Sequence, residues 1–257
     1  MTHGICNLTV IPLRKEPSHR SEMISQVLFG EHFEIFEKAE GWYRVKLAYD
    51  HYEGWITNSQ IEPIDLVEYG KLNKEQTCVS VDLVQIMIHE NSLFSIVLGS
   101  SMPHFKDHTC RLGKTAYRFE GNVKCPEKLS ATRGIVENAY MFLHSPYLWG
   151  GRTPFGIDCS GFTQMVYKLA GIRLRRDAWQ QAEQGSLIHL IDESRQGDLA
   201  FFDNEEGSIV HVGIILPNNQ VIHASGKVRI DSLDHHGIFN SETKKYTHNL
   251  RLIKRFV

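Results

Sequence analysis

One cysteine of the sequence, Cys159, stands where a thiol could act as a nucleophile. It follows Asp158, a residue type that caps helices, and it opens a run of apolar residues at helical spacing. The unpaired backbone N–H groups of a first helical turn would surround its sulfur, and the positive helix end would lower the thiol pKa. The same groups would stabilise an oxyanion formed at an attacked carbonyl. On these features alone, a buried structural thiol is an equally good interpretation.

A thiol nucleophile needs a base and a group that orients the base, and two histidines fit these roles. His211 begins the apolar segment 211–216, His223 lies in the next one, 220–224, and Pro217-Asn218-Asn219 between them is a turn signal. We therefore expect a hairpin. A register that pairs His223 with Gly213 would put both histidines on one face as diagonal neighbours. A lone strand histidine is more commonly structural, so only the combination with Cys159 favours catalysis.

Five short motifs follow one another through residues 130–257. They are Pro146-Tyr147-Leu148-Trp149-Gly150-Gly151, Gly156-Ile157-Asp158-Cys159-Ser160-Gly161-Phe162, Gly197-Asp198-Leu199-Ala200-Phe201-Phe202, His211-Val212-Gly213-Ile214 and Ile222-His223-Ala224. In content and order they resemble the NlpC/P60 family. The resemblance implies a papain-like α+β core that hydrolyses amide bonds of peptidoglycan peptides. It also implies that Cys159 is the nucleophile, that His211 is the general base and that His223 orients His211.

Two further segments resemble those γ-D-glutamyl-L-diamino acid endopeptidases, of the dipeptidyl-peptidase VI type, in which an SH3-like domain precedes the peptidase. They are Arg176-Asp177-Ala178-Trp179-Gln180-Gln181 and the loop Tyr49–Trp55. The resemblance implies a substrate-binding set formed by Asp177, Tyr52, Tyr147, Asp158, Ser160 and Glu22. Asp177 would hold a free α-amino group of the substrate, assisted by Tyr52 and Glu22. The alternatives are a surface turn for Asp177, a packed aromatic for Tyr147, a helix cap for Asp158 and a plain surface role for Glu22, which for Glu22 is the favoured one.

The predicted activity is hydrolysis of the γ-D-Glu–diamino acid bond in murein stem peptides with a free N-terminal L-Ala. A carboxylate facing a desolvated ammonium makes a strong hydrogen bond, so Asp177 would select for the free amine. Two other functions stay open: a thiol amidase or acyltransferase on the same core, and a wall-binding module without activity. We expect no metal and no cofactor.

The elements that must position these residues fall into three predicted domains. Short strands over residues 1–64 predict a small barrel. The order of the segments His32–Glu37, Gly41–Val45 and Gly54–Ile56 resembles a bacterial SH3-like domain. Residues 65–127 are again rich in strand patterns, and either a second, degenerate barrel or an extension of the first fits them. Residues 128–257 would be the peptidase domain, with helices Leu129–His144, capped by Ser130, and Cys159–Ala170, followed by strands.

Composition limits partners and compartment. The net charge of −2 gives no general attraction to nucleic acid, and no apolar run approaches the roughly 20 residues of a membrane helix. The five cysteines are scattered without a C-x-x-C pair, so we expect reduced thiols. With no secretory signal at Met1–Val10, we expect a cytoplasmic monomer that acts on peptidoglycan stem peptides; a secreted or periplasmic form with its signal removed is the alternative.

Overall fold

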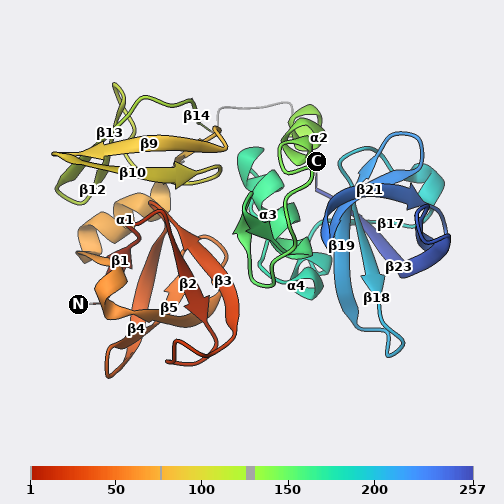
Figure 1. Ribbon diagram of the computed structural model, residues 1–257, viewed down its shortest axis with the longest axis horizontal. Coiled ribbons are helices and arrows are strands. Elements are labelled where there is room, and N and C mark those ends of the chain that lie inside the picture. Colours follow the sequence, from red (N-terminus) through yellow and green to blue (C-terminus); the bar gives the residue numbers. More distant parts are fainter. Residues whose placement is uncertain (1, 76, 126–130, 257) are drawn as a thin grey trace. The chain divides into compact units, whose positions relative to one another are not determined.

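The computed structural model describes residues 2–75, 77–125 and 131–256. It divides into two compact units, Met1–Lys128 and Leu129–Val257. Figure 1 shows the strands of the first unit in red to yellow-green and those of the second in green to blue. Helices and strands occur in both units, and the predicted α+β class is confirmed for the chain.

The first 64 residues form a barrel-like, seven-stranded antiparallel sheet in the order β3-β2-β6-β5-β4-β1-β7. The strands are β1 (His3–Ile5), β2 (Val10–Arg14), β3 (Met23–Leu28), β4 (His32–Ala39), β5 (Trp42–Leu47), β6 (Glu53–Thr57) and β7 (Glu62–Ile64). In β4, Phe33 and Ile35 are buried while Glu34 is exposed, as the alternation predicted. These two side chains join a core with Val27 and Val45.

Residues 65–127 begin with helix α1 (Leu66–Lys74) and continue as two small sheets. One sheet contains β9 (Val84–His89), β10 (Ser92–Val97), β12 (Thr109–Leu112) and β13 (Thr115–Phe119); the other contains β8 (Cys78–Ser80), β11 (Ser101–Met102) and β14 (Val123–Lys124). Their core includes Ile5 and Ile64 from the first sheet and Phe29, which directly follows β3. The separate sheets are consistent with a second barrel. The shared core is consistent with an extension of the first barrel, so both predicted alternatives remain.

Cys78 and Cys125 form a disulfide, which corrects the expectation that all five thiols are reduced. The two residues are 47 positions apart in sequence. They meet because β14 pairs antiparallel with β8, with Val123 opposite Ser80 and Lys124 opposite Val79. The next pair in that register is Cys125 and Cys78, whose Cα atoms are 4.0 Å apart. Sequence spacing alone does not reveal a pairing that depends on a long-range strand register.

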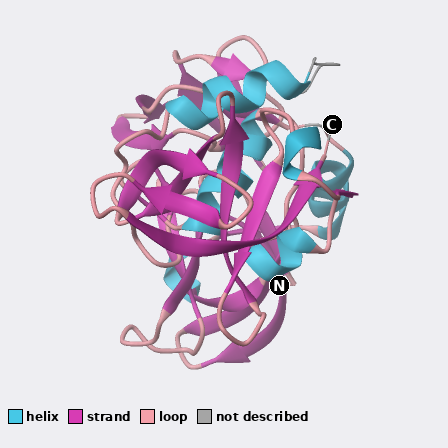
Figure 2. Cartoon of the chain, turned by 90° about the vertical axis from the view of Figure 1, so that its right-hand side faces the viewer, coloured by secondary structure: helices cyan, strands magenta, loops and turns pink. Residues whose placement is uncertain are grey.

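The second unit contains a seven-stranded antiparallel sheet in the order β17-β23-β18-β19-β20-β21-β22, which closes because β22 also pairs with β23. The strands are β17 (Ser186–Ile188), β18 (Leu199–Asp203), β19 (Ile209–Leu216), β20 (Gln220–Ser225), β21 (Lys227–Leu233), β22 (Gly237–Asn240) and β23 (Lys245–Arg255). Figure 2 shows strands in magenta and helices in cyan. The sheet core includes Ala200, Phe202 and Val221.

In the described residues, three α-helices, the short 3-10 helix η2 (Ile191–Glu193) and a short hairpin complete this unit. The helices are α2 (Ala131–Tyr140), α3 (Cys159–Leu169) and α4 (Ala178–Ala182), and the hairpin joins β15 (Arg152–Thr153) to β16 (Gly156–Ile157). Every residue of α3 is buried, since this helix contacts α2 and the strands β19 and β20. α2 is shorter than predicted, and its predicted start at Leu129 and cap at Ser130 lie outside the described residues. In the described part of the chain, no helix is long and apolar enough to cross a membrane.

Candidate active site

Cys159 is the first residue of α3, as predicted, and Asp158 is its N-cap. Asp158 Oδ1 accepts from Gly161 N at 2.6 Å, and Asp158 Oδ2 accepts from Gly150 N at 2.8 Å. A side chain at Gly161 would collide with the Gly151 carbonyl oxygen, since an added Cβ would lie 2.3 Å from it. The glycine-rich loop is therefore packed directly against the helix start and fixes the position of Cys159.

A buried arginine, which the sequence did not single out, completes this helix start. Arg176 Nη2 lies 2.6 Å from Asp158 Oδ2, and Arg176 Nη1 donates to Ser160 Oγ at 2.9 Å. The Arg176 and Asp158 side chains are only 1% and 7% exposed. With Arg176 and two backbone amides as partners, the Asp158 carboxylate is occupied inside the protein. This agrees with the helix-cap role that the sequence allowed for Asp158.

Burial dominates the electrostatics of the Cys159 thiol. It raises the pKa of Cys159 to about 12, and the charge of Asp158 adds to the increase. Hydrogen bonds with the backbone of Val212 and Ser160 and the charge of Arg176 act in the opposite direction but do not overcome burial. The lowered thiol pKa expected from the helix end alone is therefore not met. The sulfur must lose its proton to a neighbouring base rather than to solvent.

The predicted hairpin and its register are confirmed. β19 and β20 pair antiparallel around the three-residue turn 217–219, and His223 is opposite Gly213. His211 Nε2 and His223 Nδ1 are 2.9 Å apart, and the two rings are nearly perpendicular. Gly213 permits this approach, because an added Cβ would lie 3.0 Å from the Cβ of His223. Cys159 Sγ contacts the backbone of Val212, so the thiol lies against the residue that follows His211 on β19.

The chain of hydrogen bonds continues to a carboxylate that the sequence analysis missed. His223 Nε2 lies 3.0 Å from Asp231 Oδ2, and Arg229 donates to both oxygens of Asp231, at 2.7 Å and 2.9 Å. β20 and β21 form a second hairpin, with His223 opposite Arg229. Asp231 is therefore a diagonal neighbour of His223, as His211 is on the other side. The alternation Arg229-Ile230-Asp231 after the turn glycine Gly226 was the sequence signal for this contact.

His248 on β23 is a third imidazole at this site, and it was also missed. Its ring stacks on His211, with ring centroids 4.1 Å apart and planes inclined by 25°. Burial lowers the pKa of His211 well below its ordinary value, and the charges of His223 and His248 act in the same direction. Burial also lowers the pKa of His248, to about 4. His211 is therefore neutral at rest and able to accept a proton.

Tyr147 lies near the nucleophile, on the loop before the Gly-Gly turn. It forms an isolated bridge with Ile157, two residues before Cys159. Burial raises the pKa of Tyr147 to about 12, and the charges of Cys159 and Asp158 contribute. Its hydroxyl thus stays protonated as a hydrogen-bond donor. Ser160 is buried, and its hydroxyl faces Arg176 and Asp158.

Asp177 is the N-cap residue of α4 and is half-buried. Its backbone N–H donates to Gln180 Oε1 at 3.0 Å. α4 is held against the start of α3, because Gln181 Nε2 donates to the Ser160 carbonyl at 3.0 Å. Asp177 therefore lies in the short segment 176–181, and both end residues of this segment, Arg176 and Gln181, contact Ser160.

Tyr52 and Glu22 belong to the first unit. Tyr52 directly precedes β6 and packs partly against the barrel core; its backbone N–H donates to Asp50 Oδ1 at 3.0 Å. Glu22 precedes β3 and pairs with Lys15 at 3.6 Å. That these two residues assist at the site of Cys159 stays a prediction.

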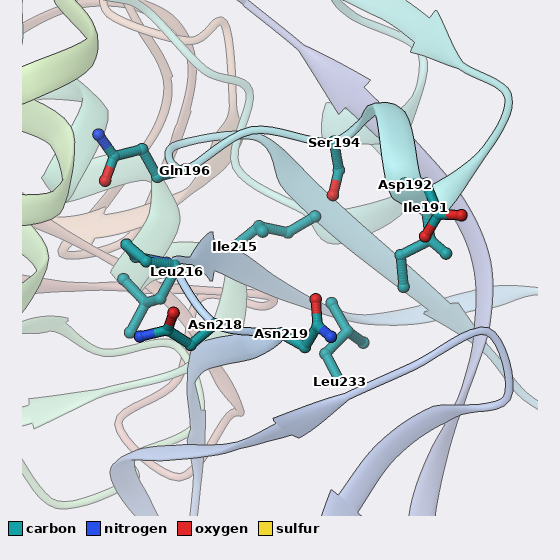
Figure 3. A pocket seen from close by; sticks show the side chains of 10 residues that line it. Ile191, Asp192, Ser194, Gln196, Ile215, Leu216, Asn218, Asn219 and Leu233 are labelled. Carbon is teal, nitrogen blue, oxygen red and sulfur yellow. The ribbon is translucent and has the colours of Figure 1, made fainter.

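Away from these residues, a pocket lies at the turn between β19 and β20 (Figure 3). Its lining includes Ile191, Ser194 and the turn residue Asn218. His211 is on the same strand as the pocket residue Leu216 but five positions earlier, roughly 17 Å along an extended strand. The pocket is therefore separate from the histidine pair. Within the described ranges, no group of three or more His, Cys, Asp or Glu side chains is arranged to hold a metal ion.

Comparisons with known proteins identify two domain families in the chain. Residues 144–248 match the NlpC/P60 family, and residues 13–61 match the bacterial dipeptidyl-peptidase SH3 domain. The chain is 28% identical over 248 residues to dipeptidyl-peptidase 6 of Lysinibacillus sphaericus, covering 86% of this chain and 88% of that protein. It is 30% identical over 213 residues to γ-D-glutamyl-L-lysine dipeptidyl-peptidase of Bacillus subtilis (strain 168), covering 78% and 71%.

Solved structures agree in fold. An NlpC/P60 family protein from Bacillus cereus ATCC 10987 superposes with a TM-score of 0.81 at 19% identity, covering 99% of both chains. An NlpC/P60 endopeptidase from Photobacterium damselae subsp. piscicida gives a TM-score of 0.73 at 16% identity, covering 98% of this chain and 70% of the other. The chain belongs to the NlpC/P60 family of cysteine peptidases and carries an N-terminal SH3 domain.

Proposed function

We propose that this enzyme cleaves the bond between γ-D-Glu and the following diamino acid in murein stem peptides with a free N-terminal L-Ala. The observation that carries the proposal is the buried thiol of Cys159 against the backbone of Val212, directly after a histidine, His211, that is hydrogen-bonded to a second one. The names of the relatives described above, dipeptidyl-peptidase 6 and γ-D-glutamyl-L-lysine dipeptidyl-peptidase, support the choice of bond.

The proposed reaction begins with transfer of the Cys159 proton to His211 as the sulfur attacks the γ-carbonyl of D-Glu. The resulting oxyanion is stabilised by backbone N–H groups at the start of α3 and by the protonated hydroxyl of Tyr147. Collapse of this intermediate expels the amine of the diamino acid, which takes the proton from His211, and leaves a thioester on Cys159. His211 then removes a proton from water, which hydrolyses the thioester and releases L-Ala-γ-D-Glu.

Recognition of the free amine is assigned to Asp177. Its place on the segment that joins Arg176 to α4 supports a carboxylate near the start of α3, because Arg176 and Gln181 both contact Ser160. A substrate ammonium would form a charge-assisted hydrogen bond with it. An acylated amine carries no charge, so the Asp177 carboxylate would be desolvated without gaining this charge-assisted bond, which costs roughly 3–5 kcal/mol. Tyr52 and Glu22 are proposed to assist from the first unit.

The test is mass spectrometry of products from L-Ala-γ-D-Glu-diaminopimelate, its lysine analogue and their N-acetylated forms. We expect L-Ala-γ-D-Glu from the free peptides and a kcat/KM at least about 100-fold lower for the acetylated ones. Equal rates on free and acetylated peptides would reject amine recognition. Cleavage between L-Ala and D-Glu would reject the assigned bond. Asp177→Asn should remove most of the discrimination; if it does not, the recognition lies elsewhere.

The compartment and the oligomeric state are also proposals. We propose a monomer that acts on released wall peptides. The cytoplasmic expectation and the Cys78–Cys125 disulfide favour different compartments, because disulfides persist mainly in oxidising ones. Counting alkylated thiols in protein isolated from its native cells under acid quench separates the two: a free Cys78 favours the cytoplasm, and an oxidised pair favours the secreted alternative.

A further inference from the structure

Asp231 ends a buried chain of hydrogen bonds that begins at His211. The links are His211 Nε2 to His223 Nδ1 at 2.9 Å and His223 Nε2 to Asp231 Oδ2 at 3.0 Å. The His223 and Asp231 side chains are 1% and 2% exposed, so water does not compete for these contacts. Both ring nitrogens of His223 and Nε2 of His211 therefore have defined partners.

The charge of Asp231 determines which nitrogens carry protons. Burial alone would raise the pKa of Asp231, but hydrogen bonds from His223 and Arg229 outweigh it and hold this pKa below its ordinary value. An ionised carboxylate only accepts hydrogen bonds, so His223 Nε2 carries a proton. In a neutral His223, Nδ1 is then unprotonated and accepts from His211. It follows that His211 carries its proton on Nε2 and has an unprotonated Nδ1.

We propose that Asp231 is a positioning residue that, through His223, fixes the tautomer of His211 with Nδ1 free to take the proton of Cys159. The inference rests on the proposed function of Cys159 and His211. When Nδ1 of His211 takes the Sγ proton, the imidazole becomes positively charged. The Asp231 carboxylate stabilises that charge through His223, while Arg229 keeps the carboxylate ionised.

The surrounding groups leave this role to Asp231. The His211 ring contacts His223 of β20 and His248 of β23, and Cys159 of α3 contacts the backbone of the next residue, Val212. His223 also faces His248, at 5.7 Å between ring centroids. Arg229 pairs with Glu242 at 3.3 Å as well as with Asp231, but Glu242 is 68% exposed. Among the contacts of these rings in the described residues, the negative charge comes from Asp231.

Two substitutions separate the two effects of Asp231. Asp231→Leu fills the space but removes the acceptor, so that the His223 tautomer is no longer fixed. We expect kcat to fall roughly 10²–10³-fold with KM changed by less than about 3-fold. Asp231→Asn keeps an acceptor oxygen but removes the charge. We expect kcat to fall about 10-fold and the limb of the pH profile that follows His211 protonation to move about one unit lower.

Asp198→Asn is the matched control. Asp198 also binds an arginine through both oxygens, Arg255, at 2.9 Å and 2.7 Å, with side-chain exposures of 4% and 20% that resemble those of the Asp231 pair. Asp198 has no hydrogen bond to the histidine chain. Its substitution should lower the thermal midpoint and leave kcat per folded molecule and the His211 limb unchanged.

The decisive readout needs no substrate. Long-range ¹H–¹⁵N spectra of histidine-labelled protein report which ring nitrogen carries the proton. We expect Nε2–H for both His211 and His223 in wild type and in Asp231→Asn, and mixed tautomers in Asp231→Leu. A wild-type His211 protonated on Nδ1, or an Asp231→Leu protein with unchanged tautomers and unchanged kcat, would overturn the inference. If wild type cleaves no stem peptide, the proposed function fails and the tautomers alone decide the role of Asp231.

Discussion

Two buried carboxylate–arginine pairs lie next to the residues proposed to react, and they differ in what the carboxylate holds. Asp158 pairs with Arg176 at the start of α3, with a shortest distance of 2.6 Å; Asp231 pairs with Arg229 on β21, with a shortest distance of 2.7 Å. The Arg176 side chain is 1% exposed and the Arg229 side chain 16%. The two ion pairs have similar shortest distances, but the two carboxylates accept their other hydrogen bonds from different groups.

The Asp158 pair fixes atoms in place, and the Asp231 pair fixes protons. Asp158 accepts from the backbone of Gly150 and Gly161, so it joins the glycine loop to the helix that carries Cys159. Asp231 accepts from the ring of His223, which in turn contacts His211. The same chemical pair therefore serves geometry at the nucleophile and protonation at the base. The difference predicts that the first pair contributes mainly to stability and the second mainly to rate.

The largest expected effect concerns the nucleophile that the two pairs serve. Cys159→Ala should reduce kcat by at least about 10⁴-fold while leaving the thermal midpoint within about 2 °C, since Asp158 and Arg176 keep their contacts. The matched control is Cys110→Ala, because Cys110 is also a buried thiol whose pKa burial raises to about 12. Steady-state hydrolysis of the tripeptide L-Ala-γ-D-Glu-diaminopimelate measures kcat of both variants. Loss of activity in Cys110→Ala with retention in Cys159→Ala would reverse the assignment.

The second prediction compares the two pairs in stability. Asp158→Ala leaves Arg176 charged and buried without its main partner, so the free energy of unfolding should fall by roughly 3–5 kcal/mol. Asp231→Ala should cost less, about 1–3 kcal/mol, because Arg229 is partly exposed and retains Glu242. Urea unfolding at pH 7 measures both values. A larger loss for Asp231→Ala than for Asp158→Ala would contradict the assignment of stability mainly to the Asp158 pair.

The smallest effect concerns pH and the histidines beside the Asp231 pair. Burial lowers the pKa of His211 and lowers that of His248 to about 4. Below pH 6.5 the unfolded chain takes up protons that the folded chain does not, so stability falls as the pH drops from 6.5 toward 4. His248 alone should contribute a loss of about 1–2 kcal/mol between pH 7 and pH 5. Asp231, with its lowered pKa, loses its contribution only below the ordinary carboxylate value of 3.8.

Urea unfolding of wild type and His248→Gln at pH 7 and pH 5 measures this loss. The variant should lose about 1–2 kcal/mol less than wild type over that interval. An equal loss in both proteins would mean that His248 is protonated in the folded state as readily as in the unfolded one.

Local sequence patterns predicted the parts of the site that are close in the chain. Asp158 before Cys159 predicted the capped helix start, and the three-residue turn between two apolar segments predicted the pairing of His223 with Gly213. Both depend on short-range rules: capping within one turn of a helix, and the register across one hairpin.

The contacts that were missed depend on elements far apart in sequence or on burial. Arg176 contacts Asp158, 18 positions away in sequence. His248 stacks on His211 because their strands, β23 and β19, both pair with β18. The Cys78–Cys125 bond depends on a register between two short strands. The raised pKa of Cys159 was missed because a sequence shows the helix end but not the degree of burial that outweighs it.

The central claim is that the Cys159 sulfur attacks the γ-carbonyl of D-Glu in a peptide with a free amine. A diazomethyl ketone built on the γ-carboxyl of L-Ala-D-Glu places its electrophilic carbon beside that carbonyl, and attack by the thiol would form a thioether with loss of nitrogen. Peptide mapping of the labelled protein should find one probe per chain, on Cys159, with labelling suppressed by the tripeptide and absent for the N-acetylated probe. Labelling of Cys6 or Cys110 instead, or labelling that the tripeptide does not suppress, would contradict the account.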